Sequence, residues 1–312
     1  MPILCRMKCS MCNEKAVGTF QEMPYCSEHF KEALESFVFS FIKEKKLIPS
    51  SKVCVAVSGG KDSTSLLNIV SKYMQNQGLG KPTALCINEG IEGYRDKTIK
   101  DIAEFCNKNE IELRIVSFKD EFGFTMDEYL EREGEHLSSP CSVCGVLRRY
   151  LLNKYARDFD VVCTGHNMDD EAQSVIMNLL NDNMGLLARQ GYFSGLLHSD
   201  KFTKRVKPFY FVKEKEIMIY SLISKFNISF NACPYAKADF RNPVRVFLNE
   251  KESEDKNAKK NVLEFYLSIK DRLAQQFLNE SLQECQICHE PSSNQICETC
   301  RIRETWAKGT SF

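Results

Sequence analysis

The sequence feature that most restricts the fold is SGGKDS, residues 58–63, which joins a strand-like run, KVCVAV, to a helix-like run, DSTSLLNIVSKYM. The glycine pair lets the backbone approach an anion, and the turn amides and helix N-terminus supply positive potential. Ser58, Lys61 and Ser63 add side-chain donors, while Asp62 could hold Mg²⁺ or cap the helix. The segment is therefore predicted to bind phosphate. It is not a Walker A loop, which requires Ser or Thr after Gly-Lys. An ordinary glycine turn with a helix cap is the alternative.

Strand-like and helix-like segments alternate along the middle of the chain. The expected strands lie at 52–57, 82–88, 111–118 and 160–166, and the expected helices at 29–48, 62–74, 95–109, 142–156 and 168–180. Such alternation is typical of a parallel sheet covered on both faces. We expect an α/β fold with a doubly wound, Rossmann-like parallel sheet. The charged stretch at 249–261 is expected to be a solvated helix face or a linker.

Composition adds limits on partners and location. The 312 residues are 43% hydrophobic and 27% charged, with a formal net charge of zero, so a nucleic-acid partner would require a local basic face. KFTKRVKPFYFVKEK (201–215) is a candidate, because it interleaves basic residues with Phe202, Phe209 and Tyr210. The alternative for this stretch is an exposed strand. The sequence has no apolar run of the ~18 residues that a membrane span needs, and its first residues include charges; we expect no membrane contact and a cytoplasmic location.

The fifteen cysteines fall mainly into three groups. Two groups have the spacing of closed tetrahedral zinc sites: Cys9, Cys12, Cys26 and His29 near the start, and Cys285, Cys288, Cys297 and Cys300 near the end. The sequence thus predicts two Zn²⁺ and three regions: an N-terminal zinc knuckle (1–32), a catalytic domain (33–280) and a C-terminal zinc knuckle (281–312). CQICH also fits c-type haem attachment, but the second Cys-x-x-Cys favours zinc. Cys54, Cys86 and Cys163 lie in apolar strands and are expected to be buried.

The middle group is Cys141, Cys144 and Cys233. Three thiolates without a fourth make a poor structural zinc site but suit a [4Fe-4S] cluster that has one open iron. Two alternatives stay open: a persulfide and disulfide relay without metal, and three unrelated buried thiols.

The motifs together resemble a known family. SGGKDS after an apolar strand resembles the PP-loop of the N-type ATP pyrophosphatases, and TGHNMDDEAQSVIMNLL (164–180) resembles a second stretch of their tRNA-modifying members. With a knuckle at each end and the central cysteines, nearly the whole chain resembles the TtuA/Ncs6 family of tRNA 2-thiouridine synthetases. Some members have a lysine where this chain has Arg148, so a role requiring a deprotonatable amine is in doubt.

The resemblance implies a substrate, cofactors and a reaction. ATP with Mg²⁺ would adenylate the C2 oxygen of a tRNA uridine, and sulfur carried by the cluster would then replace that oxygen. We expect position 34, with uridine 54 of the T-loop as the alternative. A ubiquitin-like carrier protein, a persulfide or sulfide would donate the sulfur, and the enzyme would be a homodimer. The implied ATP-site residues are Ser58, Gly59, Gly60, Lys61, Asp62, Ser63, Arg148, Gly165 and Asp170. The implied catalytic residues are Asp62, Cys141, Cys144, Arg148 and Cys233, with Arg149 as a further candidate beside them.

Two further functions fit parts of the sequence. A PP-loop amidating or lysidine-forming ligase would use ATP but leave the central cysteines unexplained. A zinc-knuckle RNA-binding protein without catalysis would leave the intact SGGKDS unexplained.

Overall fold

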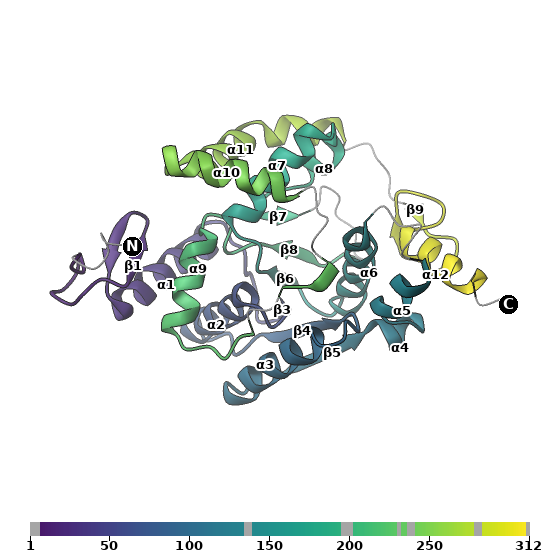
Figure 1. The fold of residues 1–312 in the computed structure, drawn as a ribbon, viewed down its shortest axis with the longest axis horizontal. Helices are drawn as coiled ribbons and strands as arrows, with labels where there is room; N and C mark the ends of the chain where they lie inside the picture. Colours follow the sequence, from purple (N-terminus) through teal and green to yellow (C-terminus); the bar gives the residue numbers. More distant parts are fainter. Residues whose placement is uncertain are drawn as a thin grey trace.

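The computed structural model describes residues 7–133, 139–194, 202–229, 232–235, 241–277 and 283–309. A six-stranded sheet of order β5-β4-β3-β6-β8-β7 lies at the centre (Figure 1). Its strands are β3 (Val53–Val57), β4 (Thr83–Asn88), β5 (Leu113–Ser117), β6 (Val161–Thr164), β7 (Phe193–Ser194) and β8 (Lys204–Val206). All neighbouring strands pair in parallel except β7, which runs antiparallel to β8. The predicted α/β fold with a parallel sheet is confirmed, with an antiparallel edge added.

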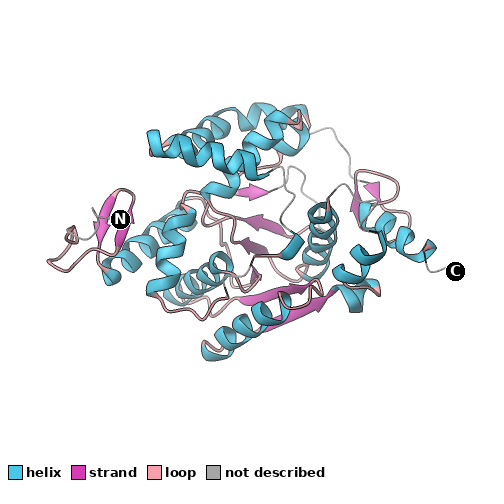
Figure 2. Ribbon diagram, in the orientation of Figure 1, coloured by secondary structure: helices cyan, strands magenta, loops and turns pink. Residues whose placement is uncertain are grey.

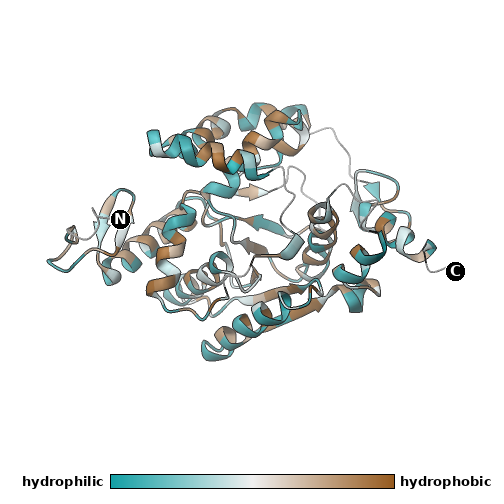
Figure 3. Ribbon diagram, viewed as in Figure 1, coloured by the Kyte–Doolittle hydropathy of each residue, from teal (hydrophilic) through white to brown (hydrophobic). Residues whose placement is uncertain are grey.

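Helices surround this sheet (Figure 2). They are α1 (Ser27–Glu44), α2 (Lys61–Asn76), α3 (Arg95–Lys108), α4 (Phe118–Phe122), α5 (Met126–Glu133), α6 (Pro140–Tyr155), α7 (Met168–Leu180), α8 (Met184–Ala188), α9 (Glu214–Ile223), α10 (Arg241–Glu254) and α11 (Ala258–Gln276). Most carry hydrophobic and hydrophilic residues on different sides (Figure 3), as expected for helices that cover a sheet. Among the described helices, none combines the length and the apolar character needed to cross a membrane.

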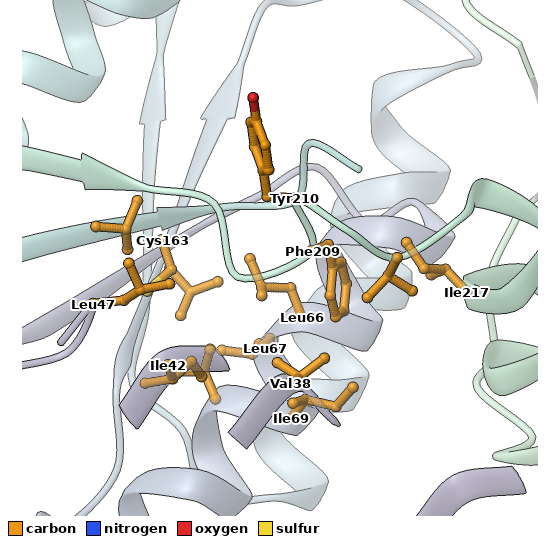
Figure 4. Packing of buried hydrophobic residues seen from close by; sticks show 14 of the residues in the cluster. Val38, Ile42, Leu47, Leu66, Leu67, Ile69, Cys163, Phe209, Tyr210 and Ile217 are labelled. Carbon is orange, nitrogen blue, oxygen red and sulfur yellow. The ribbon is translucent and has the colours of Figure 1, made fainter. Parts of the chain in front are cut away.

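Alternate residues of the strands enter two apolar clusters, one on each face of the sheet. In β3, for example, Val53, Val55 and Val57 join one cluster and Cys54 joins the other, because side chains alternate along a strand. The first cluster, part of which is drawn in Figure 4, includes residues of α1, α2, α3 and α9. The second cluster includes residues of α4, α5 and α6. Cys54, Cys86 and Cys163 are fully buried, as predicted.

The two knuckles lie at opposite ends of the molecule (Figure 1). The N-terminal knuckle consists of the hairpin of β1 (Gly18–Phe20) and β2 (Met23–Tyr25) and the start of α1. The predicted end of this knuckle is residue 32, but α1 continues through that position without a break. Glu216 of α9 accepts a 3.2 Å hydrogen bond from the Gln21 N–H and so ties the hairpin to the core. The C-terminal knuckle contains β9 (Gln283–Glu284), β10 (Pro291–Ser292) and α12 (Glu298–Lys308); its expected start, residue 281, lies outside the described residues.

The basic and aromatic stretch at 201–215 does not form the predicted exposed platform. Its strand β8 is paired on both sides, with β6 and with β7. Phe209 and Tyr210 lie in the turn after β8 and are fully buried in the first apolar cluster, on opposite sides of the chain that carries them (Figure 4). Lys207 is buried in a 2.8 Å ion pair with Glu171. Lys201 lies outside the described residues. The alternative of an exposed strand is also wrong.

The charged stretch at 249–261 forms the end of α10 and the start of α11, and most of it is solvated as expected. Lys259 is an exception, with only 2% of its side chain exposed. It is ion-paired with Asp169 of α7 and, at 2.8 Å, with Glu252 of α10. This paired charge joins three helices, and its burial is possible because its partners satisfy the ammonium group.

Candidate active site

The loop at 58–60 is held in a fixed shape at the carboxyl end of β3. Ser63, in the first turn of α2, accepts a 3.0 Å hydrogen bond from the Ser58 N–H, and the two hydroxyls lie 3.1 Å apart. Arg95 donates a 2.7 Å hydrogen bond to the Ser58 carbonyl oxygen. These bonds shape the loop while α2 directs its N-terminus, with its favourable dipole, toward the site.

Two glycines of the predicted site are required by close backbone packing. Gly59 has φ +77°, and a Cβ added there would lie 2.1 Å from the Thr98 carbonyl oxygen. A Cβ on Gly165, at the end of β6, would lie 3.2 Å from the backbone of Asp62 and Ser63. Glycine at 165 therefore lets the turn after β6 press against the loop, which brings the two sequence motifs into one site.

A cavity of about 300 Å³ opens where these turns meet. Of the predicted ATP-site residues, its lining includes Ser58, Asp62, Ser63, Arg148, Gly165 and Asp170. Lys61 instead forms 2.8 Å ion pairs with Asp62 and Glu214. The lining adds Arg95, His166 and Arg241, which were not predicted from the sequence. The position of this cavity, outside the carboxyl ends of parallel strands, is where open α/β sheets bind their ligands.

The two cavity carboxylates have perturbed acidity. Burial raises the pKa of Asp62, although Lys61 opposes the shift. Burial also raises the pKa of Asp170, against the opposing charge of Arg241 at 3.4 Å. Burial disfavours the charge on Lys61, but Asp62 and Glu214 together outweigh it and raise the pKa of Lys61. Two carboxylates that burial leaves short of hydration suit a divalent cation, because Mg²⁺ prefers oxygen ligands.

Arg148 reaches the cavity from α6 and pairs with a carboxylate that the sequence did not reveal. Its Nε lies 3.1 Å from Oε1 of Glu89, which is 2% exposed and also ion-paired with Arg95. Glu89 follows β4 directly. It could have been suspected, because the carboxyl ends of parallel strands meet at one edge of the sheet. Arg149, the next residue along α6, does not line this cavity and lines a separate one beside the C-terminal knuckle instead.

The central cysteines come from two segments. Cys141 and Cys144 lie in the first turns of α6, and Cys233 lies in the segment 232–235. The Cys141 thiol donates to the Tyr235 carbonyl oxygen, with Sγ 3.9 Å from the oxygen, and Cys144 and Cys233 pack against the same apolar cluster. Burial, followed by the charge of Glu89, raises the pKa of Cys144 to about 12. The described residues include no disulfide at these positions.

These three thiols are not arranged like the terminal groups. In each terminal group, the four ligand atoms all lie within 4.8 Å of one another, whereas the central three form no such group among the described residues. Cys12 and Cys26 sulfurs lie 3.8 Å apart, and those of Cys288 and Cys297 lie 3.7 Å apart. A tetrahedral ion with Zn–S bonds of ~2.3 Å requires sulfurs ~3.8 Å apart. The terminal groups therefore match the geometry of a single zinc ion, and the central cysteines do not.

Backbone amides favour the thiolate form of one cysteine in each terminal group, Cys9 and Cys285, whereas the pKa values of Cys12, Cys297 and Cys300 are raised. Burial opposes ionisation of Cys9, but hydrogen bonds from backbone N–H groups, that of Cys26 foremost, lower its pKa to about 6. Cys285 shows the same balance, with the Cys297 N–H donating at 3.3 Å and a pKa of about 6. Lower pKa values favour the thiolate, which is the form that binds a metal.

Fold and cavity together define a class of protein, the α/β nucleotide-binding proteins with a PP-loop. Comparison with known proteins agrees: the family model of the PP-loop domain matches residues 27–252. The tRNA-5-methyluridine(54) 2-sulfurtransferase of Pyrococcus horikoshii is 36% identical over 301 residues, covering 95% of this chain and 93% of that protein. The tRNA 2-thiolation protein NcsA of Haloferax volcanii is 29% identical, covering 96% and 99%. The solved structure of the U34-tRNA thiolase NcsA from Methanococcus maripaludis, with its [4Fe-4S] cluster, matches with a TM-score of 0.80 and 29% identity over 96% of each chain.

The chain therefore belongs to the PP-loop family of tRNA 2-sulfurtransferases, and the predicted relationship is confirmed. Membership also makes it an enzyme of tRNA 2-thiolation, which excludes the binding protein without catalysis.

Proposed function

We propose that this enzyme converts a tRNA uridine to 2-thiouridine, in the cytoplasm, by activating the C2 oxygen with ATP. The observation that carries this proposal is one cavity that joins the 58–63 loop, Arg148 and Asp170, with two of the central cysteines, Cys141 and Cys144, on the helix that supplies Arg148. In the first step, the uridine O2 would attack the α-phosphorus of ATP and pyrophosphate would leave. In the second, hydrosulfide would attack C2, and AMP would leave with the former O2.

The chain's own residues have defined parts in this reaction. The amides at the start of α2, with Ser58 and Ser63, would bind phosphate oxygens. Asp62 and Asp170 would hold Mg²⁺, which screens the charge on the phosphates. Arg148 would donate to the departing pyrophosphate or AMP, with Glu89 fixing its direction. Lys61 would keep Asp62 ionised through its 2.8 Å ion pair.

The residues present fit an iron–sulfur cluster held by three thiolates. Cys141, Cys144 and Cys233 converge from two segments, are not oxidised to disulfides, and do not form the close group that a single zinc ion requires. A cube of four irons and four sulfides keeps its ligating sulfurs further apart than one ion does. When bound, a [4Fe-4S] cluster would supply an open iron that carries the sulfur. A persulfide relay remains the alternative chemistry for the same cysteines.

We further propose that each terminal group binds one Zn²⁺ and stabilises its knuckle, on the strength of the sulfur spacings given above. A ubiquitin-like carrier protein or free sulfide would donate the sulfur, and the active form would be a homodimer. The cytoplasmic location is supported by relatives such as cytoplasmic tRNA 2-thiolation protein 1 of Schizosaccharomyces pombe, which is 30% identical.

The target is proposed to be uridine 34, supported by the whole-chain likeness to the Methanococcus maripaludis U34-tRNA thiolase. Uridine 54 is a second candidate, favoured by the higher identity to the Pyrococcus horikoshii enzyme. Protein reconstituted with iron and zinc would be incubated anaerobically with unmodified tRNA, Mg-ATP and sulfide, and nucleosides would be located by mass spectrometry. Sulfur that appears at one of these positions only with ATP supports the proposal. ATP-dependent release of pyrophosphate without sulfur transfer would instead favour the ligase.

A further inference from the structure

His166 lines the nucleotide cavity, yet the reaction described above gives it no part. It follows β6, two residues after Thr164, the last residue of that strand. Its side chain is exposed, whereas Thr164 beside it is buried. Because the ring lines the cavity, a ligand bound there can reach it.

The hydrogen bonds of Thr164 determine which nitrogen of the His166 ring carries the proton. The Thr164 hydroxyl donates to the carbonyl oxygen of Val206 at 3.5 Å, and its oxygen lies 3.0 Å from Nδ1 of His166. A hydroxyl has a single proton, so with that proton directed to Val206 the oxygen accepts from Nδ1–H of the ring. A neutral ring protonated at Nδ1 has a lone pair at Nε2. Nε2 has no hydrogen-bond partner among the residues that the structure describes.

The charges around His166 keep its ring neutral. Although the ring is open to the cavity, the surrounding protein desolvates it, and this burial together with the positive charge of Lys207 lowers the pKa of His166 to about 4. Arg241 and Arg148 act in the same direction. Glu171 opposes the shift, but it is itself paired with Lys207 at 2.8 Å. At neutral pH the ring therefore keeps its Nε2 lone pair and accepts a hydrogen bond there.

The lining of the cavity differs between its two sides. Most of the apolar lining comes from β3 and β4 and consists of Ala56, Val57, Leu85 and Ile87. An apolar surface of this kind suits the faces of an adenine ring. His166 and Asp170 lie on the other side, after β6, and the phosphate-binding loop lies between, since β3 pairs with both β4 and β6. Adenosine on the apolar side would leave the β6 side of the α-phosphorus to the attacking nucleophile.

We propose that Nε2 of His166 accepts a hydrogen bond from N3–H of the target uridine and so selects uridine as the base to be activated. The inference rests on the proposed function and names the group that recognises its substrate base. N3–H adjoins the C2 carbonyl, so this hydrogen bond would orient O2 toward the α-phosphorus. Cytidine has a lone pair at N3 instead of a proton, and that lone pair would repel Nε2.

The same hydrogen bond would strengthen during the reaction. As O2 bonds to phosphorus, positive charge develops on the base, and N3–H becomes a stronger donor. An interaction that is stronger in the transition state than in the bound substrate raises kcat more than it lowers KM. Loss of the acceptor should therefore appear mainly in kcat.

The test compares His166→Asn with His166→Gln in the full-length enzyme reconstituted with iron and zinc. The side-chain amide of glutamine reaches the place of Nε2, whereas that of asparagine reaches only the place of Nδ1. Thiolation of an unmodified tRNA transcript is measured with Mg-ATP and sulfide. His166→Asn should lower kcat about 10- to 100-fold, as for the loss of a hydrogen bond to a charged group, with little change in the KM for tRNA. His166→Gln should restore most of the activity, because its amide oxygen accepts the same hydrogen bond.

A third variant tests the part of Thr164. Thr164→Val keeps the side-chain shape but removes the oxygen that accepts from Nδ1–H of His166. It should lower kcat in the otherwise wild-type enzyme and have no further effect when combined with His166→Asn, since the two residues would act through one hydrogen bond. Mg-ATP affinity without tRNA, measured by titration calorimetry, should be unchanged in both His166 variants.

A final measurement uses the wild type alone and therefore requires no variant to fold. A transcript with cytidine at the target position should be thiolated at least about 100-fold more slowly than the uridine transcript, because an acceptor would face an acceptor. Equal rates on the two transcripts would overturn the inference. So would wild-type kcat in His166→Asn, equal losses in the asparagine and glutamine variants, or a loss of Mg-ATP affinity as large as the loss of kcat. A wild type that thiolates neither transcript would overturn the proposed function and this inference with it.

Discussion

Arg148 and Glu89 form an ion pair at the wall of the nucleotide cavity, with Arg148 Nε 3.1 Å from Glu89 Oε1. Glu89 is also paired with Arg95, which in turn donates to the carbonyl oxygen of Ser58 in the phosphate-binding loop. One buried carboxylate therefore connects the loop to the helix that carries Cys141 and Cys144. This connection fixes the distance between the place where ATP would be cleaved and the place where sulfur would arrive.

Arg148→Lys should weaken Mg-ATP binding about 10-fold, although it keeps the charge. A guanidinium can donate to Glu89 and to a phosphate at once, whereas an ammonium on a flexible chain fixes neither direction. Because 45% of the Arg148 side chain is exposed, the melting temperature should change little. Titration calorimetry with Mg-ATP measures the effect. Arg148→Gln should bind Mg-ATP still more weakly than Arg148→Lys. Wild-type affinity in the lysine variant would show that charge alone is sufficient.

Asp62→Asn should reduce ATP-dependent thiolation at least 100-fold while leaving the ligand-free protein as stable as before or more so. Burial raises the pKa of Asp62, which means that its charge is unfavourable in the folded state at neutral pH. Lys61 keeps Glu214 as a partner at 2.8 Å. Melting temperatures without ligand and pyrophosphate release with tRNA would be compared. A large loss of stability in the ligand-free variant would contradict this account.

Mg-ATP affinity should fall on acidification at a pH above the ordinary aspartate pKa of ~3.9. Burial raises the pKa of both Asp62 and Asp170, so on acidification the carboxylate form that binds Mg²⁺ is lost at a higher pH than for an ordinary aspartate. The stability of the ligand-free protein should change with pH in the opposite direction. The contribution of these two groups to ligand-free stability is full below their unfolded pKa and is lost as pH rises through the folded pKa. Asp170→Asn should reduce the pH dependence of both the Mg-ATP affinity and the ligand-free stability. A pH dependence identical to that of the wild type would disprove the role of Asp170 in binding Mg²⁺.

Chelation should change the fluorescence of Trp306, the only tryptophan in the sequence. Trp306 lies on α12 with the guanidinium of Arg132 3.4 Å from its ring centroid and Phe124 at 4.8 Å. Loss of metal from the C-terminal knuckle would release the start of α12 and shift the emission to longer wavelength. The variant Cys12→Ser removes a ligand of the N-terminal knuckle only, so it should contain one zinc less and keep the emission. Unchanged emission after both ions are removed would exclude a structural role for the second site.

The sequence predicted elements and local motifs better than contacts between distant segments. SGGKDS and Gly165 come together as expected, because both follow parallel strands and therefore lie at the same edge of the sheet. Arg95 and Arg241 were not predicted, since their positions depend on how α3 and α10 pack. Phe209 and Tyr210 were misinterpreted for the same kind of reason: they are buried because the turn after β8 packs into the first apolar cluster, which the composition of the segment does not indicate.

The ion pair between Arg148 and Glu89 makes the helical phase of α6 part of the chemistry. Inserting one residue between Cys144 and Arg148 would rotate everything after it by ~100° while leaving the helix intact. The insertion would put Leu147 in the place of Arg148, so that an apolar side chain would face Glu89. Substitutions on this helix can be accommodated singly, whereas a shift in its length would uncouple the nucleotide cavity from the cysteines at the start of the helix.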